Sequence, residues 1–466
     1  MVLFIFLLLA LPLLLSFLLR KHKAKRNLHL PPGPEGLPFI GNLHQFDSLN
    51  PHSCLWQLSQ KYGPLMSLRL GFVPILVVSS AKMAKEIMKT HDLIFCSRPS
   101  LVSQQKLSYN GLDLAFSPYA AYWREIRKIC EFEVSHMLEK ITKSAVASKP
   151  VNLSEAMMSL TSTIICRVAF GKRCEEDGET QALFASFFVS DYFSFLGFID
   201  KFTGLAHRLE KNFKEFDIFY EQIIQEHLDP SRSKTREEDI LDILLQLWKN
   251  RSCKVELTID HIKAVLMNAF VGGTETSAAT VVWAMTLLMK NSIAMKKAQE
   301  EVRKLIGMKG FVEEEDTEQL PYLKAVIKET MRAPLLIPRE SCENCILGGY
   351  DIPAKTVAYV NTWAIGRDPD IWENPEEFDP ERFINSSIDL KGQDFELIPF
   401  GAGRRICPGM FMGLATVEVS LANLLYKFDW EMPVGMKEED VDMDAQPGLT
   451  MHKKNALCLM AQKYDR

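Results

Sequence analysis

The pattern of hydrophobic and polar residues divides the chain into a short apolar N-terminus and a long mixed body. Residues 2–19 contain no charge, and the next seven residues carry a basic cluster, Arg20, Lys21, Lys23, Lys25 and Arg26. An apolar run of about 20 residues can span a bilayer, and basic residues stay on its cytosolic side. We therefore expect residues 1–19 to form a single-pass transmembrane anchor. Residues 20–34, which end in "LPPGP", would be a basic stop-transfer segment and a proline-rich hinge. The alternative is a cleaved signal peptide, which would need positive charge before the apolar run.

The body has a mixed but mostly helical pattern. Alternation on both sides of a glycine-containing turn predicts a β-hairpin over residues 65–80. The polar stretch 229–239 predicts an exposed loop. Apolar residues at helical spacing predict helices over 81–92, 209–228, 238–249 and 259–290. The fold class expected is one domain that is mainly α with small β-sheets.

Composition narrows the possible functions. The chain has 466 residues and a net charge of −5, so its bulk charge does not indicate nucleic-acid binding. Its 10 cysteines are irregularly spaced over this length, which favours reduced thiols over a disulfide scaffold.

One cysteine lies in an unusual loop, "PFGAGRRICPG", directly before the amphipathic run that begins at Met410. A helix N-terminus favours a thiolate, so Cys407 is a candidate nucleophile or metal ligand. No histidine lies between residues 347 and 450 to act as a nearby base, although a distant one could fold in. The single C-x-x-C, Cys342 to Cys345, has no second pair nearby, which argues against zinc. A thiolate bound to haem iron remains.

The predicted helix over 259–290 contains "AFVGGTETSAAT". Gly272 and Gly273 each cost about 1 kcal/mol against alanine in a helix interior, which indicates something bulky against the backbone. Thr276 can donate a hydrogen bond to the Gly272 carbonyl, and Glu275 lies beside it. This group is either a proton-delivery pair or a helix-packing notch with a solvated glutamate.

Two further helical motifs allow simple interpretations. In "KETMR", Glu329 and Arg332 share one helix face, and the default expectation is an exposed ion pair. In "YWREIRK", Trp123 and Arg127 lie one turn apart, where the arginine could bind an anionic group or cover the core edge.

The sequence "FGAGRRICPG" resembles the F-x-x-G-x-R-x-C-x-G haem-binding signature of the cytochrome P450 superfamily. The matching residues are Phe400, Gly403, Arg405, Cys407 and Gly409. "GGTETS", "KETMR", "PERF" and "WREIR" resemble other motifs of that family, in its order and over nearly the whole chain. Segments such as "KYGPL" and "DIPAKT" are similar to plant microsomal members of specialised metabolism, including the aldoxime-metabolising branch.

The resemblance implies a haem-binding catalytic domain over residues 35–466, with haem b held between the long central helix and the helix after the Cys loop. Cys407 would be the proximal iron ligand. Arg405, Arg127, Trp123 and Arg339 would contact the haem propionates. Gly272 and Gly273 would border the oxygen site, where Glu275 and Thr276 would help to deliver protons. Arg382 of "PERF" would join Glu329 and Arg332.

The same resemblance implies the partners. A monooxygenase of this type needs electrons, and the chain has no G-x-G-x-x-G loop, so an NADPH-dependent flavoprotein reductase would supply them. Candidate docking residues for it are Arg124, Lys128 and Arg404. The expected substrate is a small hydrophobic plant metabolite. The expected location is the endoplasmic reticulum membrane, with the catalytic domain in the cytosol and no nucleic-acid partner.

The chain also departs from the family pattern. Relatives carry a few more residues after Arg332, in a place where the family lines its substrate pocket and supports the haem. They also have a longer helical stretch after Cys130. The alternative is therefore an inactive or haem-poor relative, or a truncated splice or gene-model product. The retained Glu275 and Thr276 argue against a relative that rearranges substrates without oxygen activation.

Overall fold

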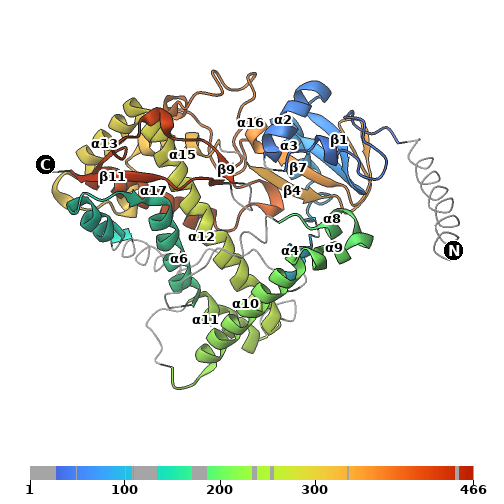
Figure 1. Cartoon of the computed structure of the whole chain (residues 1–466), viewed down its shortest axis with the longest axis horizontal. Helices are drawn as coiled ribbons and strands as arrows, with labels where there is room; N and C mark the ends of the chain where they lie inside the picture. The colour runs from blue at the N-terminus through green and yellow to red at the C-terminus, as the bar shows by residue number, and fades with distance from the viewer. Residues whose placement is uncertain are drawn as a thin grey trace.

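Figure 1 shows the computed structural model of the whole chain. It describes residues 28–48, 50–99, 101–107, 109, 134–135, 137–170, 186–232, 239–251, 257–332, 335–446 and 451–464. The expected anchor lies outside these residues, and so do Trp123, Arg124, Arg127 and Lys128 and the three residues that follow Cys130.

Helices make up most of the described body. They are α2 (Pro51–Tyr62), α3 (Ala81–Lys85), α4 (Val102–Leu107), α6 (Leu153–Phe170), α8 (Val189–Tyr192), α9 (Phe198–Phe202), α10 (Leu205–Leu228), α11 (Ile240–Lys249), α12 (Ile259–Lys290), α13 (Ser292–Ile306), α14 (Glu314–Thr317), α15 (Pro321–Thr330), α16 (Thr362–Ile365) and α17 (Met410–Lys427). Short 3-10 turns are η2 (Leu43–Gln45), η4 (Ser194–Leu196), η5 (Gly307–Lys309), η6 (Pro380–Phe383), η7 (Gly403–Arg405) and η8 (Glu438–Asp440), and η3 (Glu86–Thr90) is a π-helical turn.

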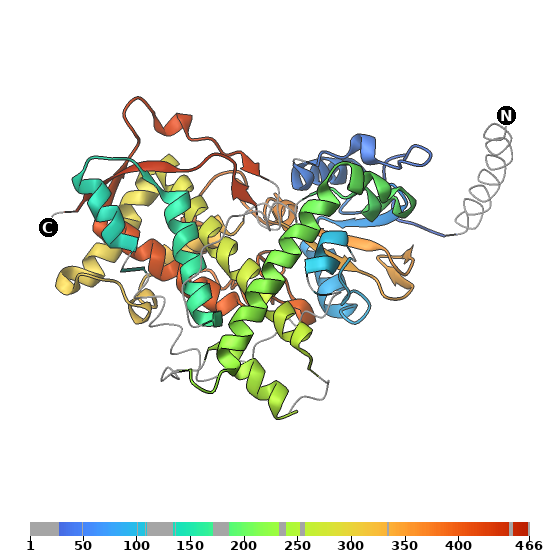
Figure 2. The ribbon, with the colours of Figure 1, turned by 60° about the horizontal axis from the view of Figure 1, so that its bottom comes forward.

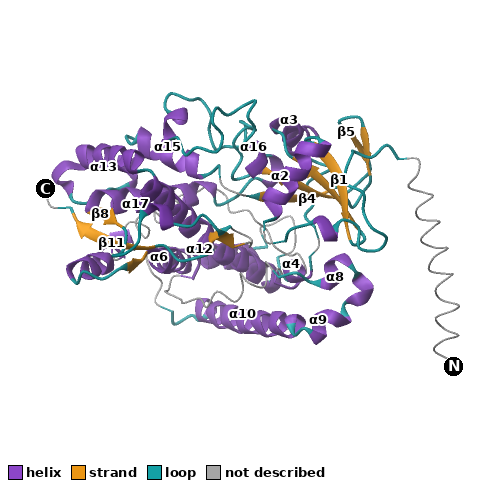
Figure 3. Cartoon of the chain, turned by 45° about the horizontal axis from the view of Figure 1, so that its top comes forward, coloured by secondary structure: helices purple, strands orange, loops and turns teal. Residues whose placement is uncertain are grey.

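The strands form small sheets. They are β1 (Leu65–Leu70), β2 (Val73–Val78), β3 (Val151–Asn152), β4 (Leu336–Glu340), β5 (Cys345–Leu347), β6 (Tyr350–Ile352), β7 (Val357–Asn361), β8 (Phe428–Glu431), β9 (Ala445–Gln446), β10 (His452–Lys453) and β11 (Cys458–Lys463). The largest sheet has the order β1-β2-β7-β4, in which β2 and β7 are parallel and the other pairs antiparallel. It lies on one side of the molecule, while α13, α15 and α17 gather on the other (Figure 3).

Helix α12 runs through the middle of the molecule, and α10 crosses beside it (Figure 2). Of its 32 residues, 20 are buried, because its apolar side chains surround the helix instead of forming one stripe. Val281 and Val282 pack in one apolar core with α6 and α17. Thr258 caps its N-terminus by accepting a hydrogen bond from the backbone of His261.

The fold class is confirmed, and several local predictions agree with the structure. The helix predicted over 259–290 has these bounds, and the hairpin over 65–80 is β1 and β2. The predicted helix over 81–92 differs, because it changes at Glu86 from α3 to the π-helical turn η3. Within the described residues, α6 has the length and hydropathy to cross a membrane, but 61% of it is buried, as in a core helix.

Candidate functional site at the Cys407 loop and helix α12

The loop before α17 is folded back on itself. The Cys407 backbone N–H donates to the Phe400 carbonyl over 2.9 Å, and the Ile406 N–H donates to the Gly403 carbonyl over 3.1 Å. Gly401 and Gly403 have φ values of 72° and 69°, a conformation that favours glycine. This fold places Cys407 immediately before the first turn of α17, as the sequence predicted.

The loop glycines have different surroundings. A Cβ atom on Gly403 would lie 2.1 Å from the carbonyl oxygen of Met88, so this glycine lets the loop approach η3. The contact is reinforced by Arg404, whose Nε lies 3.1 Å from Asp92 Oδ2. Gly409 has no atom within 4 Å of a Cβ position, so its backbone is open to approach by another group.

The thiol of Cys407 is not ionised by its surroundings in the chain alone. Burial raises its pKa, and this effect exceeds the opposing effects of the Gly409 backbone N–H and Arg98. In the chain without a cofactor, burial therefore favours the neutral thiol of Cys407 over its thiolate. A metal ion bound to the sulfur would supply the missing positive charge.

Arg405 of this loop lies near two arginines from other segments, Arg98 and Arg339. An Arg339 guanidinium nitrogen lies 3.4 Å from the carbonyl oxygens of Ala402 and Arg405, and Arg405 Nε donates to the Cys96 carbonyl over 2.8 Å. Arg98 donates to the Pro338 carbonyl over 2.7 Å. Burial, with repulsion from Arg98 and Arg405, lowers the pKa of Arg339 to about 9.

A negatively charged group beside these arginines would relieve that repulsion. The propionate carboxylates of haem have this charge, and arginine binds carboxylates well. The residues therefore fit haem both through the sulfur of Cys407 and through the arginine cluster, Arg98, Arg339 and Arg405. Sequence reasoning missed Arg98, because no motif spacing connects "SRPS" with β4 or the Cys407 loop.

Helix α12 presents an exposed stripe within its buried length. Gly272 and Thr276 are exposed although their neighbours are mostly buried. The Thr276 hydroxyl donates to the Gly272 carbonyl over 2.7 Å, as predicted. The two glycines differ, because a Cβ on Gly273 would lie 2.3 Å from Ile165 Cδ1 of α6, whereas Gly272 faces open space.

Glu275 lies next to Thr276 but is not a solvated residue. It is 5% exposed, and its Oε2 lies 2.7 Å from His452 Nε2 on β10. This contact excludes the solvated glutamate of the packing-notch alternative. Sequence reasoning missed His452, which is 177 residues away in the chain.

The expected exposed pair of Glu329 and Arg332 is wrong. Both side chains are buried and form an ion pair, and Arg382 Nε lies 3.0 Å from Glu329 Oε2. Arg332 also donates to the Gly366 and Pro375 carbonyls over 2.7 and 2.5 Å. The network joins α15 to η6 and to the segment before it.

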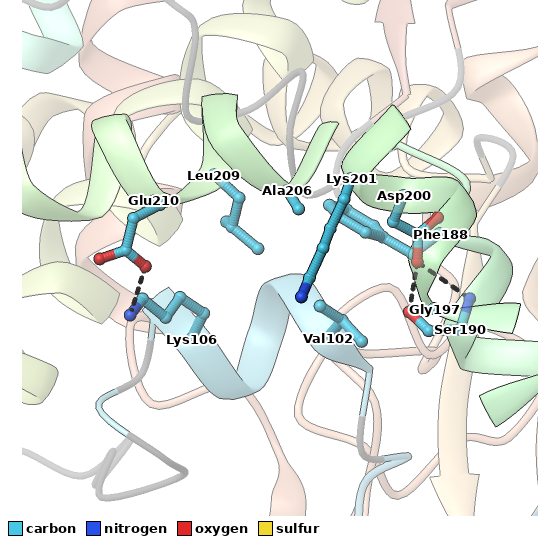
Figure 4. Close-up of a pocket in the computed structure, with 10 residues that line it drawn as sticks. All are labelled: Val102, Lys106, Phe188, Ser190, Gly197, Asp200, Lys201, Ala206, Leu209 and Glu210. Atoms are coloured by element: carbon cyan, nitrogen blue, oxygen red, sulfur yellow. Dashed lines mark hydrogen bonds and ion pairs between the residues drawn. The ribbon is translucent and has the colours of Figure 1, made fainter. Parts of the chain in front are cut away.

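Two segments whose sequences are rich in aromatic or apolar residues meet at a separate pocket of about 210 Å³ (Figure 4). Val102 and Lys106 come from α4, and Phe188 and Lys201 come from the stretch around α8 and α9. Lys106 pairs with Glu210 across the pocket over 2.7 Å. Phe195, Phe198 and Phe202 are exposed and so are not core residues.

Comparisons with known proteins agree with this geometry. The family model of cytochrome P450 matches residues 31–460. The chain is 51% identical to 5-OH-xanthotoxin synthase and 50% identical to 6,7,8-trihydroxycoumarin synthase, both from Pastinaca sativa. Each alignment covers 99% of this chain, with 98% of the first relative and 99% of the second.

The fold is also similar to a solved zebra fish cytochrome P450 with abiraterone. The TM-score is 0.71 at 25% identity, and the match covers 89% of this chain and 100% of the other. The family match spans far more than half of the sequence, and the relatives are plant enzymes similar over their whole length. The chain therefore belongs to the cytochrome P450 family.

Proposed function

We propose that this protein is a haem-thiolate monooxygenase that oxygenates a small aromatic plant metabolite of the coumarin class. The family implies a haem-thiolate cofactor, a redox partner reductase and a small-molecule substrate. The observation that carries the proposal is the arginine cluster at the Cys407 loop, in which Arg339 is buried.

Each part of the site has a role in this proposal. Cys407 is the sulfur ligand of the iron, and Arg98, Arg339 and Arg405 bind the propionates, joined by Arg127 and Trp123. When bound, haem supplies oxygen activation and transfer of one oxygen atom to the substrate. Phe400, Gly403 and Gly409 shape the Cys loop.

The residues of α12 border the reaction in the same proposal. Gly272 leaves open space at the exposed stripe, and Gly273 lets α6 pack closely behind it. The Thr276 hydroxyl and the Glu275 carboxyl hold and move protons there. Thr276 is exposed on that stripe, whereas Glu275 is reached through a different face of the helix.

The substrate class follows from the relatives, which are named for coumarin products and not for aldoximes. A coumarin is flat and largely apolar, and would suit a site bordered by glycine. Residues 35–466 would form the catalytic domain, held at the endoplasmic reticulum membrane by residues 1–19 and the hinge over 20–34. An NADPH-dependent flavoprotein reductase would supply electrons.

The test is a carbon-monoxide difference spectrum of the reduced recombinant protein. We expect the strongly red-shifted Soret band of a cysteinate-ligated haem, absent in Cys407→Ala and retained in Cys342→Ala, which removes an exposed cysteine. A band in Cys407→Ala, or no such band in the wild-type protein, would refute the assignment. Turnover with the reductase and xanthotoxin then tests the substrate class.

A second candidate, an inactive or haem-poor relative, is favoured by one observation. The alignment with 5-OH-xanthotoxin synthase extends over 501 positions, more than the 466 residues of this chain, so that relative has segments without a counterpart here. In this proposal the shortening after Arg332 and after Cys130 weakens haem uptake. A wild-type protein that is folded but shows no haem band would favour it, and transcript sequencing across both positions would show whether the gaps are real.

A further inference from the structure

We propose that His452 is a positioning residue that holds the Glu275 carboxylate and connects it to solvent. Protons would then reach Glu275 through the imidazole of β10 and not from the open stripe of α12. This inference rests on the proposed function for the role of Glu275. It deepens that function by adding a residue from outside the helix.

Two neighbouring faces of α12 have different surroundings. Gly272 and Thr276, four residues apart, lie on the exposed stripe. Glu275 and Trp283, eight residues apart, lie on the face that contacts the C-terminal hairpin. Glu275 is 5% and Trp283 7% exposed, so the carboxyl group has no broad access to solvent of its own.

The hairpin is held against this face of α12 next to its histidine. Trp283 Nε1 donates to the Met451 carbonyl over 2.8 Å, and Lys453 Nζ pairs with Asp442 over 2.7 Å. His452 lies between Met451 and Lys453 in the chain, and its Nε2 is 2.7 Å from Glu275 Oε2. The Trp283 hydrogen bond to the residue before His452 therefore holds the histidine against α12, whereas the Lys453 pair joins β10 to Asp442, which lies outside α12.

The exposure of the two partners sets the direction of proton supply. The His452 side chain is 25% exposed, whereas the Glu275 side chain is 7% exposed. An imidazole can take a proton at Nδ1 and release another at Nε2, which leaves it neutral with the proton on its other nitrogen. One proton enters from solvent and one arrives on the Glu275 carboxylate, and no electron moves in this step.

The experiment compares three variants with wild-type protein. His452→Gln keeps a hydrogen-bond donor but removes the two-nitrogen relay, and Glu275→Gln removes the acceptor carboxylate. Lys453→Gln is the matched control, because it removes the neighbouring contact of the same strand, with Asp442, without touching Glu275. Carbon-monoxide spectra first establish that each variant retains haem.

The first readout is the fate of electrons when NADPH, oxygen and the reductase are supplied without added substrate. Electrons that are not recovered as hydrogen peroxide reduce oxygen to water. Water formation takes more protons for each oxygen molecule than hydrogen peroxide formation does. We expect this water-forming share to fall at least threefold in His452→Gln and Glu275→Gln, and to stay within a factor of 1.5 in Lys453→Gln. Equal shares in wild type and His452→Gln would overturn the relay.

The second readout does not use the activity of the haem protein. Thermal unfolding midpoints are measured for His452→Gln, Glu275→Gln and the double variant. We expect the double variant to lose no more than the larger single loss, whereas Lys453→Gln and Glu275→Gln should add. Additive losses for the histidine pair would overturn the contact even if wild-type protein lacked haem, an outcome that would separately refute the proposed function.

Discussion

The buried carboxylate of Glu329 allows a quantitative test of how strongly its ion pairs join α15 to η6. Its side chain is 1% exposed and lies between Arg332 and Arg382, whose side chains are 4% and 10% exposed. The substitution Glu329→Gln removes the negative charge but keeps the shape. It leaves two buried guanidinium groups without their shared carboxylate.

Breaking a buried ion pair by removing one partner typically costs about 3–5 kcal/mol. Here the loss should lie near the lower limit, because Arg332 keeps its hydrogen bonds to the Gly366 and Pro375 carbonyls and Arg382 keeps one to the Glu373 carbonyl. We expect Glu329→Gln to lower the free energy of unfolding by about 3 kcal/mol. This corresponds to roughly a hundredfold change in the unfolding equilibrium.

The assay is urea unfolding followed by tryptophan fluorescence at pH 7. Glu381→Gln is the matched control, because Glu381 is adjacent to Arg382 in the chain but pairs with Lys297 where both side chains are about half exposed. Its loss should be at most about 1 kcal/mol. If Glu329→Gln cost no more than this control, the buried network would not stabilise the fold as argued.

The remaining predictions concern glycine positions and one buried histidine. Gly403→Ala should lower the free energy of unfolding in urea by about 2–4 kcal/mol and should also lower the haem content. In the control Gly409→Ala the new Cβ has no atom within 4 Å, so the loss should be less than about 1 kcal/mol. Equal losses would contradict the contact between Gly403 and Met88. Gly272→Ala should raise the thermal midpoint through a helix-propensity gain of about 1 kcal/mol, and a lower midpoint would show that the space beside it is not open. Burial and the nearby Arg367 lower the pKa of His52 from 6.5 to about 4, so the unfolded chain binds a proton there first as pH falls. The free energy of unfolding should therefore be higher by up to about 3 kcal/mol above pH 6.5 than near pH 4. In urea unfolding at several pH values, His52→Phe should remove this dependence on pH. The control His207→Phe, at an exposed position, should keep it.

Local patterns predicted the parts of the fold that depend on nearby residues. Helix α12 could be bounded from sequence because its apolar residues continue over 32 positions between polar caps, Thr258 and Asn291. The pairing of β2 with β7 could not, because Val78 meets Val360 and no local pattern records such a distant partner. The change to a π-helical turn at Glu86 also lacks a local signal, since residues 81–92 keep a helical pattern throughout.

The candidate site divides in the same way. Cys407, its loop glycines and the Thr276 hydrogen bond follow from short segments, so spacing was enough to find them. Arg98 and His452 act through contacts with residues far away in the chain, and their own segments carry no motif. Glu329 was placed on the correct helix face but with the wrong exposure, because burial depends on η6 and the segment before it, which pack against α15 from elsewhere.

The electrostatics of the Cys407 loop and the arginine cluster support one conclusion about what completes this site. Burial raises the pKa of Cys407, so a thiolate there is unfavourable, and burial with mutual repulsion lowers the pKa of Arg339, so its guanidinium is also costly. The two groups are close enough for Arg98 to influence both. A simple anion would relieve the arginines but oppose the thiolate, and a simple cation would do the reverse. A cofactor with a metal cation at its centre and carboxylates at its edge relieves both, and haem has this distribution of charge.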